Sequence, residues 1–463
     1  MRLPQFSSRP AARSHPLLAR VASGLVLAGV GVAVALGAAG SSGSDWGTFL
    51  GPTNDGRSPE SGLLLKWPEG GPPLKWQRDL GDGYSMVSIA DGRCFIFDRH
   101  GDRARLTAVN SETGEELWRS EYPTRYEDYY GYSVGPRASP VIDDDRVYTF
   151  GVEGRLRSHR VEDGKLLWEV DTEEEFGVVK NFFGVGSTPV VEGPLLITMI
   201  GGSPEDSPKI HSGEVQGNGT GIVAFDKMTG EVRYSVSNEL ASYSSPRIVT
   251  IGSRRWGFLF ARGGLVGFEP TTGKVDFEFP WRAKVLESVN AATPVVVDDT
   301  IFLSECYGPG SVLLRINGTN PEVTWKDPPR GKSLESHWNT PIHHAGYLYG
   351  SSGRNSGNAE LRCVKHATGE VQWSEPGLSR STMLYADGHF VVLTEYGRLL
   401  VIEATSEEFR PISDVTLEDP ATGKPLLAHP AWNAPVLAHG ILYARGKDRL
   451  VALDLNPPGT PGS

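Results

Sequence analysis

Ala108-Val109-Asn110-Ser111-Glu112-Thr113-Gly114-Glu115-Glu116-Leu117-Trp118 is the stretch that decides the fold. The same pattern of an apolar strand, a Thr-Gly turn and a tryptophan returns as Cys363-Val364-Lys365-His366-Ala367-Thr368-Gly369-Glu370-Val371-Gln372-Trp373. Eight copies can be traced, and the last, Val451-Ala452-Leu453-Asp454, ends before its turn and its aromatic residue. The strand that would complete it lies at the other end of the chain, in Leu74-Lys75-Trp76-Gln77. A repeat divided between the two ends predicts a closed ring, because pairing of the halves protects the sheet edges.

Each copy opens with a Ser/Thr-Pro-Val-like strand start, such as Ser139-Pro140-Val141. Proline suits the first residue of a strand because no ladder hydrogen bond is needed there. The second residue of this start is Met86 in the first copy and Pro435 in the eighth. The seven intervals therefore average about 50 residues, which is typical of propeller blades. The sequence predicts an all-β, eight-bladed β-propeller of four-stranded antiparallel blades over residues 74–455, in which the N-terminal strand pairs with the C-terminal blade.

The fourth strand of each copy starts with an aromatic side chain, which we expect to pack between neighbouring sheets. These structural docking aromatics are Trp76, Trp118, Trp168, Tyr234, Phe277, Trp325, Trp373 and Phe409. Glycine fills the preceding turn in most copies, where positive φ is required. The fifth and seventh copies depart from the pattern, with Asn320-Pro321 and Ser406-Glu407 near the turn.

The first 39 residues have the pattern of a targeting segment. Four arginines precede a run from Val21 to Ala39 that carries no charge. This pattern predicts a signal peptide or an N-terminal membrane anchor over residues 1–39, and either one places the rest of the chain outside the cytoplasm. We therefore expect an exported protein, located in the periplasm or cell envelope, secreted, or anchored by its N-terminus. Residues 40–73 read as a lead-in segment and residues 456–463 as a disordered tail.

Charge and cysteine usage restrict the partners and the chemistry. The net charge of −11 argues against nucleic acid as a partner, since phosphate binding needs a basic surface. The three cysteines form no CxxC motif and no adjacent pair. Cys94 and Cys363 fall in strand patterns, where they are expected to act as small buried hydrophobic residues.

The repeated pattern Ala-x-Asn/Asp-x-x-Thr-Gly-x-x-x-Trp resembles the tryptophan-docking motif of the quinoprotein dehydrogenase propellers, the PQQ-like repeat family. The resemblance covers residues 74–455, and the opening from Trp46 to Ser58 looks like the lead-in of exported PQQ-like repeat proteins. The non-enzymatic branch of this family includes the propeller lipoprotein of the outer-membrane β-barrel assembly machine. This chain is similar to that branch in architecture, but no cysteine for lipid attachment follows its apolar segment.

The enzyme branch of the family implies features that this chain does not match. Its alcohol and methanol dehydrogenases use a disulfide between adjacent cysteines, a calcium or lanthanide ion held by Glu, Asn and Asp, and a catalytic Asp. No Cys-Cys pair, no matching ligand set and no haem-binding Cys-x-x-Cys-His occur in the sequence. We therefore expect no cofactor, with PQQ and calcium kept as the alternative.

The loops that join one blade to the next should meet around the central funnel, which is where a ligand or a partner would bind. The candidate funnel residues are Tyr84, Tyr132, Asn181, Glu287, Asn290, Glu335, His337, Trp338, Asn339, Arg380, Trp432 and Asn433. A structural interpretation, in which these groups bond to one another and to buried water, stays open beside it. Glu287, Glu335, His337 and Arg380 are residue types used for acid and base catalysis.

Two hypotheses on function follow. The first is an exported, non-catalytic, monomeric propeller that acts as a scaffold for envelope or secreted proteins. The alternative is a propeller that binds PQQ or another small ligand in its funnel, as a relative of the quinoprotein dehydrogenases.

Overall fold

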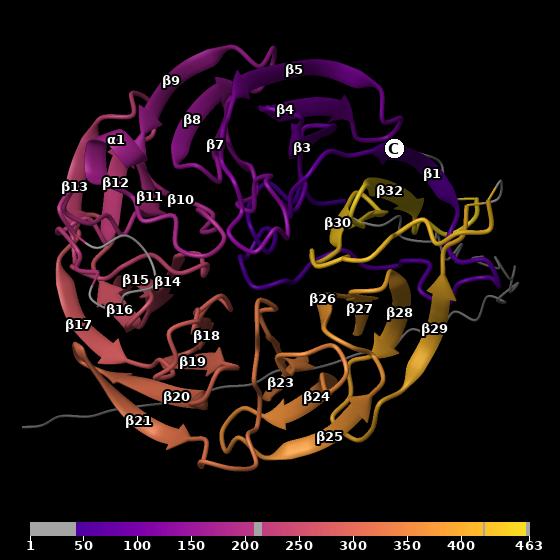
Figure 1. Cartoon of the computed structure of the whole chain (residues 1–463). Coiled ribbons are helices and arrows are strands. Elements are labelled where there is room, and N and C mark those ends of the chain that lie inside the picture. Colours follow the sequence, from indigo (N-terminus) through magenta and orange to yellow (C-terminus); the bar gives the residue numbers. More distant parts are fainter. Residues whose placement is uncertain (1–42, 208–214, 420–421, 460–463) are drawn as a thin grey trace, which may run out of the picture. The chain divides into compact units, whose positions relative to one another are not determined.

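Eight four-stranded antiparallel sheets stand around a common axis in the computed structural model (Figure 1), which describes residues 43–207, 215–419 and 422–459. These residues belong to one compact unit, Ala39–Ser463. The predicted eight-bladed propeller is confirmed. The predicted signal or anchor segment at residues 1–39 lies outside the described residues, as do residues 460–463 of the predicted tail. Within the described ranges, no helix is long and apolar enough to cross a membrane.

Blades 1 to 7 each use four strands that are consecutive in the sequence, and the first strand of each blade is the innermost (Figure 1). Blades 1 to 4 are formed by β2 (Ser88–Ala90), β3 (Arg93–His100), β4 (Arg103–Asn110) and β5 (Glu116–Pro123); β6 (Val141–Asp143), β7 (Arg146–Phe150), β8 (Arg155–Arg160) and β9 (Leu166–Asp171); β10 (Val190–Glu192), β11 (Leu195–Met199), β12 (Ile222–Asp226) and β13 (Val232–Val236); β14 (Arg247–Ile251), β15 (Arg254–Phe260), β16 (Gly264–Phe268) and β17 (Val275–Pro280). Blades 5 to 7 are formed by β18 (Val295–Val297), β19 (Thr300–Glu305), β20 (Gly310–Asn317) and β21 (Asn320–Lys326); β22 (Ile342–His344), β23 (Tyr347–Ser352), β24 (Glu360–Lys365) and β25 (Val371–Pro376); β26 (Ser381–Ala386), β27 (His389–Thr394), β28 (Arg398–Glu403) and β29 (Pro411–Thr416). A short helix, α1 (Thr172–Phe176), follows β9 and is capped by the Asp171 side chain.

Blade 8 closes the ring with strands from both ends of the described chain. Its inner three strands are β30 (Val436–Ala438), β31 (Ile441–Arg445) and β32 (Arg449–Asp454), and its outer strand is β1 (Leu74–Asp79). The β1 strand pairs antiparallel with β32, so that Leu74 lies opposite Leu453 and Trp76 opposite Ala452. The predicted closure of the ring is therefore confirmed.

The docking aromatics bind each blade to the next one. The indole of Trp118 donates a hydrogen bond to the carbonyl of Val161 in the following blade, at 2.9 Å. Equivalent bonds are donated by Trp76, Trp168, Tyr234, Trp325 and Trp373. The turn glycine of the following blade faces the ring, and a Cβ on Gly164 would lie 2.4 Å from the Trp118 indole. The Thr-Gly turn is thus explained by positive φ and by this close approach.

Phe409 is a correction to the predicted docking set, and Phe277 differs from the other members. Phe277 sits in the docking register opposite Gly267, but its ring packs against Trp256 and Phe258 without a polar partner. Phe409 lies ahead of β29, against the Trp373 ring of the preceding blade. The docking register of blade 7 belongs to Ser413, which is paired with Val401 directly before the β-bulge. The prediction for Phe409 was wrong because the irregular turn of this copy shifts the register.

The lead-in segment crosses the face of the propeller that carries the Thr-Gly turns. Its backbone pairs with β2 at Trp46 and Ile89, with β6 at Gly47 and Ile142, and with β26 at Gly56 and Tyr385. The carbonyl of Thr53 accepts a hydrogen bond from Arg247 of β14. Trp46 is almost fully buried and joins the hydrophobic cluster of blades 7, 8 and 1. The lead-in is therefore an integral part of the fold that spans the bottom of the central channel.

Candidate functional site: the central funnel

A cavity of about 440 Å³ lies on the axis and opens on the face opposite the lead-in. Every one of the eight blade-to-blade connections contributes to its wall. These contributions include Tyr84, Tyr132, Phe183, Tyr243, Glu287, His337, Arg380 and Trp432. Phe49 and Leu50 of the lead-in also line the cavity and form its floor, because the lead-in pairs with the far ends of the inner strands. The channel is consequently a funnel with one open end.

A buried carboxylate holds the aromatic loop on one side of the mouth. The Asp128 side chain is fully buried and pairs with the guanidinium of Arg137. Its Oδ1 atom also accepts hydrogen bonds from the backbone N–H groups of Tyr130 and Tyr132, at 2.9 and 3.1 Å. Arg137 donates in addition to two carbonyls of the same loop. Asp128 therefore fixes the loop that presents two tyrosines to the funnel.

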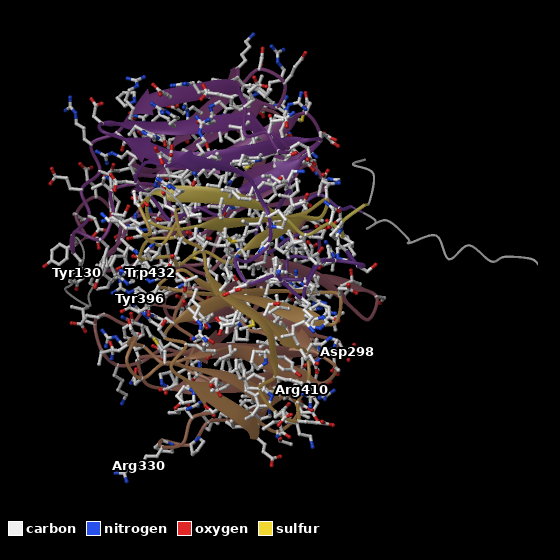
Figure 2. The ribbon with its side chains drawn as sticks, turned by 90° about the vertical axis from the view of Figure 1, so that its right-hand side faces the viewer. Tyr130, Asp298, Arg330, Tyr396, Arg410 and Trp432 are labelled. Carbon is white, nitrogen blue, oxygen red and sulfur yellow. The ribbon has the colours of Figure 1, made fainter. Side chains whose placement is uncertain are left out.

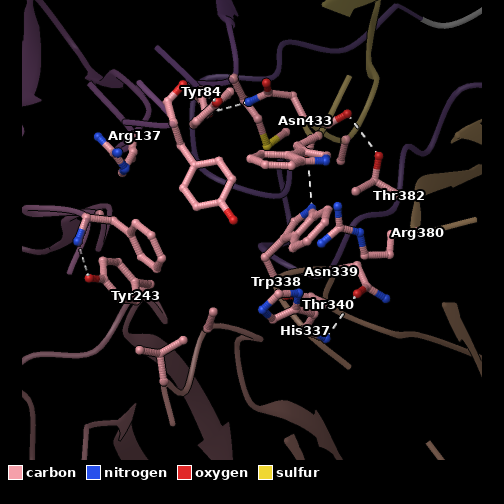
Figure 3. Close-up of a pocket in the computed structure, with 18 of the residues that line it drawn as sticks. Tyr84, Arg137, Tyr243, His337, Trp338, Asn339, Thr340, Arg380, Thr382 and Asn433 are labelled. Atoms are coloured by element: carbon pink, nitrogen blue, oxygen red, sulfur yellow. Dashed lines mark hydrogen bonds between the residues drawn. The ribbon is translucent and has the colours of Figure 1, made fainter. Parts of the chain in front are cut away.

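A second buried carboxylate, Glu395, holds Arg380 and Trp432 on the other side of the funnel mouth. Its side chain is fully buried, and it accepts hydrogen bonds from the Arg380 guanidinium and from the Trp432 indole at 2.7 and 3.1 Å. Burial alone would raise the pKa of Glu395, but these hydrogen bonds outweigh it and lower the pKa to about 2. The Arg380 guanidinium stacks on the Trp338 ring (Figure 3) and also on the Trp432 ring. Both guanidinium groups are thus neutralised and oriented by buried acids.

The rings at the mouth form a cup. Trp432 contacts Tyr84 and Trp338 with ring centroids 5.0 Å apart in each case, at interplanar angles of 47° and 49°. Tyr132 meets Trp432 at 59° and Phe183 at 64°. Aromatic pairs favour such tilted contacts over face-to-face stacking. Because the rings are inclined to one another, the wall is concave and offers no flat platform.

The remaining charges of the mouth are Arg354 and Glu287, which are both exposed. The Arg354 guanidinium stacks on the Tyr307 ring at 4.4 Å and pairs with no carboxylate among the described residues. The His337 ring and the Tyr307 hydroxyl form a hydrogen bond, with 2.9 Å between Nε2 and the hydroxyl oxygen. Burial, helped by the nearby Arg380 and Arg354, lowers the pKa of His337 to about 3, so its ring is neutral at physiological pH.

Nine of the twelve predicted funnel residues line the cavity, and Figure 3 shows several of them. The other three, Asn181, Asn290 and Glu335, do not line it. Asn290 is buried and its amide bonds to the backbone at Ala261, while Asn181 accepts a hydrogen bond from Arg262. Glu335 is partly buried outside the lining, and burial raises its pKa.

The four candidate acid and base residues do not assemble into a catalytic set. Glu335 lies outside the cavity wall, Arg380 is paired with Glu395, and His337 stays neutral. Only Glu287 is left as a carboxylate among the described lining residues, and it has no histidine partner there. These four residues therefore form no acid and base pair for proton transfer among themselves.

Several lining residues were not among the predicted set. Phe49 and Leu50 come from the lead-in, which no repeat pattern marks as part of the funnel. Tyr307 and Arg354 follow the second strands of blades 5 and 6, whereas the prediction used only the loops between blades. The signal that could have found them is topological, because the turn after the second strand of a blade lies on the same face as those loops.

A scan against known protein families matches the family described as outer membrane protein assembly factor BamB. Its model matches residues 73–203 and 102–375, which together span more than half of the chain. The chain belongs to this family of PQQ-like propellers. Two solved structures share the fold at low sequence identity. BamB from Moraxella catarrhalis is 14% identical with a TM-score of 0.54, over 84% of this chain and 100% of that one.

The second solved structure is an enzyme. Quinohemoprotein alcohol dehydrogenase from Comamonas testosteroni is 12% identical with a TM-score of 0.62, over 88% of this chain and 80% of that one. Among curated proteins, quinoprotein alcohol dehydrogenase PedH from Pseudomonas putida is 34% identical over 77 residues. That match spans 15% of this chain and only 12% of the relative's length.

The donor set of the funnel does not fit the quinone and metal pair of the enzyme branch. No group of three His, Cys, Asp or Glu residues within the described ranges is arranged to hold a metal ion. The three cysteines are buried, free and distant in sequence, and burial raises the pKa of each thiol.

Proposed function

We propose that this chain is an exported, non-catalytic propeller that binds partner proteins through the mouth of its funnel. The observation that carries the proposal is the composition of the mouth, in which Tyr, Trp and Arg side chains are held rigidly by buried acids. These three residue types dominate the energetic centres of protein interfaces, and Lys is depleted there. The described lining contains three arginines and no lysine.

Export and a location in the cell envelope are part of this proposal. They are supported by the charged and apolar pattern of residues 1–39 and by the description of the family as an outer membrane assembly factor. The partners we propose are accordingly envelope or secreted proteins. A single propeller is a sufficient unit, since β1 pairs with β32 and completes the fourth strand of blade 8 within one chain.

A site-specific cross-linking experiment tests the binding role. A photoreactive phenylalanine analogue replaces Tyr130 at the mouth or Asp298 on the opposite side, two positions well separated in Figure 2. We expect defined cross-linked proteins from position 130 in intact cells and none of them from position 298. Equal patterns from both positions would overturn the proposal, as would reduction of a redox dye by the purified protein with alcohols, PQQ and calcium.

A small ligand in the same funnel is the second candidate, and the closed apolar floor of Phe49 and Leu50 favours it. A thermal-shift screen with PQQ, calcium and sugars tests it. A specific ligand at a hundredfold excess over its Kd stabilises the fold by about 2.7 kcal/mol.

A further inference from the structure

We propose that the funnel recognises a loop or chain end of a partner protein that carries an acidic residue beside an aromatic or large aliphatic one. This inference rests on the proposed protein-binding function and names the chemistry of the bound segment. The apolar side chain enters the cup, and the carboxylate pairs with Arg354 at the rim.

Arg354 is the guanidinium that remains available to a partner. Arg137 and Arg380 also line the cavity, but the guanidinium of each one already donates hydrogen bonds to a buried carboxylate and to a backbone carbonyl oxygen. Arg354 is exposed and donates to no carboxylate among the described residues, while stacking on Tyr307 restricts its orientation. A guanidinium held in this way is prepared for two parallel hydrogen bonds to a carboxylate.

The polarity of the cavity changes with depth. The lead-in contributes the apolar Phe49 and Leu50 to the lining and no charged side chain, and Met86 and Met383 add further apolar surface. The charged groups belong to the rim, where Arg354 and Glu287 come from different blades. An apolar side chain is therefore favoured in the interior, and an acidic neighbour is favoured on the Arg354 side only.

The shape of the wall favours a protein segment over a polysaccharide. Polysaccharide chains stack along flat and open aromatic surfaces, whereas the rings here meet at angles of 47° to 64° and surround a blind cavity. Tyr130 and Tyr396 are about half exposed beside the mouth and extend the apolar rim. Figure 2 shows both tyrosines near Trp432 at the same edge of the molecule. A rim of this kind suits the tip of a loop.

The test selects random dodecapeptides displayed on phage against the full-length protein. We expect enriched peptides to contain Asp or Glu within two positions of an aromatic or large aliphatic residue. Each enriched peptide is then synthesised with its acid or with the matching amide, and its affinity is measured by calorimetry. Arg354→Gln should weaken the acidic form about tenfold and leave the amide form unchanged, because a hydrogen bond to a charged group is lost.

The controls separate this inference from the proposed function. Arg330→Gln removes an exposed arginine at the periphery, away from Tyr130 in Figure 2, and should change neither affinity. Peptides that lose affinity on Tyr130→Ala but show no acid preference would overturn this inference and leave protein binding at the funnel intact. Peptides that bind Tyr130→Ala as well as the unchanged protein, or no enrichment at all, would overturn both.

Discussion

Replacement of Trp76 by alanine tests the closure of the ring. Trp76 is 8% exposed, and truncation of a buried tryptophan costs about 3–5 kcal/mol. Its indole donates a hydrogen bond to the Ser111 carbonyl at 2.8 Å, but the Tyr443 hydroxyl donates to the same oxygen at 3.0 Å. The carbonyl therefore keeps a partner after the substitution, and no large penalty for an unsatisfied group is added. We expect a loss of about 3–5 kcal/mol that arises from the cavity.

Equilibrium unfolding in urea, followed by circular dichroism, measures this loss. Leu74→Ala is the matched control, because Leu74 lies on the same strand, belongs to the same antiparallel pair and is 43% exposed. It should cost less than about 1 kcal/mol, as expected for a largely exposed site. If Trp76→Ala is no more destabilising than Leu74→Ala, then β1 does not carry the closure and the reasoning is refuted.

Three further outcomes are expected. Gly114→Ala should destabilise the fold by about 1–3 kcal/mol in the same urea assay, because Gly114 has a φ of 73° and its new Cβ would lie 2.8 Å from the docking indole. Asp128→Ala should increase the amide exchange of Tyr130 and Tyr132 by at least about tenfold in hydrogen-exchange measurements, while blade amides stay protected. Glu395 has a pKa of about 2 against an ordinary value of 4.5, so it stabilises the fold above pH 4.5 by about 3 kcal/mol, and this contribution disappears as the pH falls to 2. The difference in melting temperature between the unchanged protein and Glu395→Gln should therefore shrink from pH 5 to pH 2.5.

Much of the fold could be predicted because its determinants are local and repeated. The Thr-Gly turn requires positive φ, and the aromatic residue that follows requires a buried position. Every regular copy therefore carries a glycine and an aromatic residue at fixed positions of the repeat. Gly164 and Trp118 show how the two signals belong together, since the glycine faces the ring of the preceding blade. Ring closure followed from the strand that the last copy lacks.

The candidate site was less predictable because its key contacts join residues far apart in sequence. Asp128 and Glu395 are ordinary acids in the sequence, and only the folded ring shows that both are buried and hold aromatic loops. Arg354 stacks on Tyr307 from another blade, and no sequence spacing predicts that contact. A repeat pattern therefore predicts the scaffold, whereas the lining of its funnel depends on loops that differ from blade to blade.

The exception in blade 7 follows from the way the ring closes. A docking aromatic packs on the turn between the third and fourth strands of the next blade, but blade 8 has no such turn, because its third and fourth strands come from opposite ends of the chain. Ser413 takes the docking position instead, and its hydroxyl donates to the Leu65 carbonyl at 2.7 Å and accepts from the Trp67 N–H at 2.8 Å. The lead-in thus supplies the surface that the turn provides elsewhere. The same segment closes the funnel with Phe49 and Leu50, so ring closure and the blind end of the candidate binding site depend on one stretch of chain.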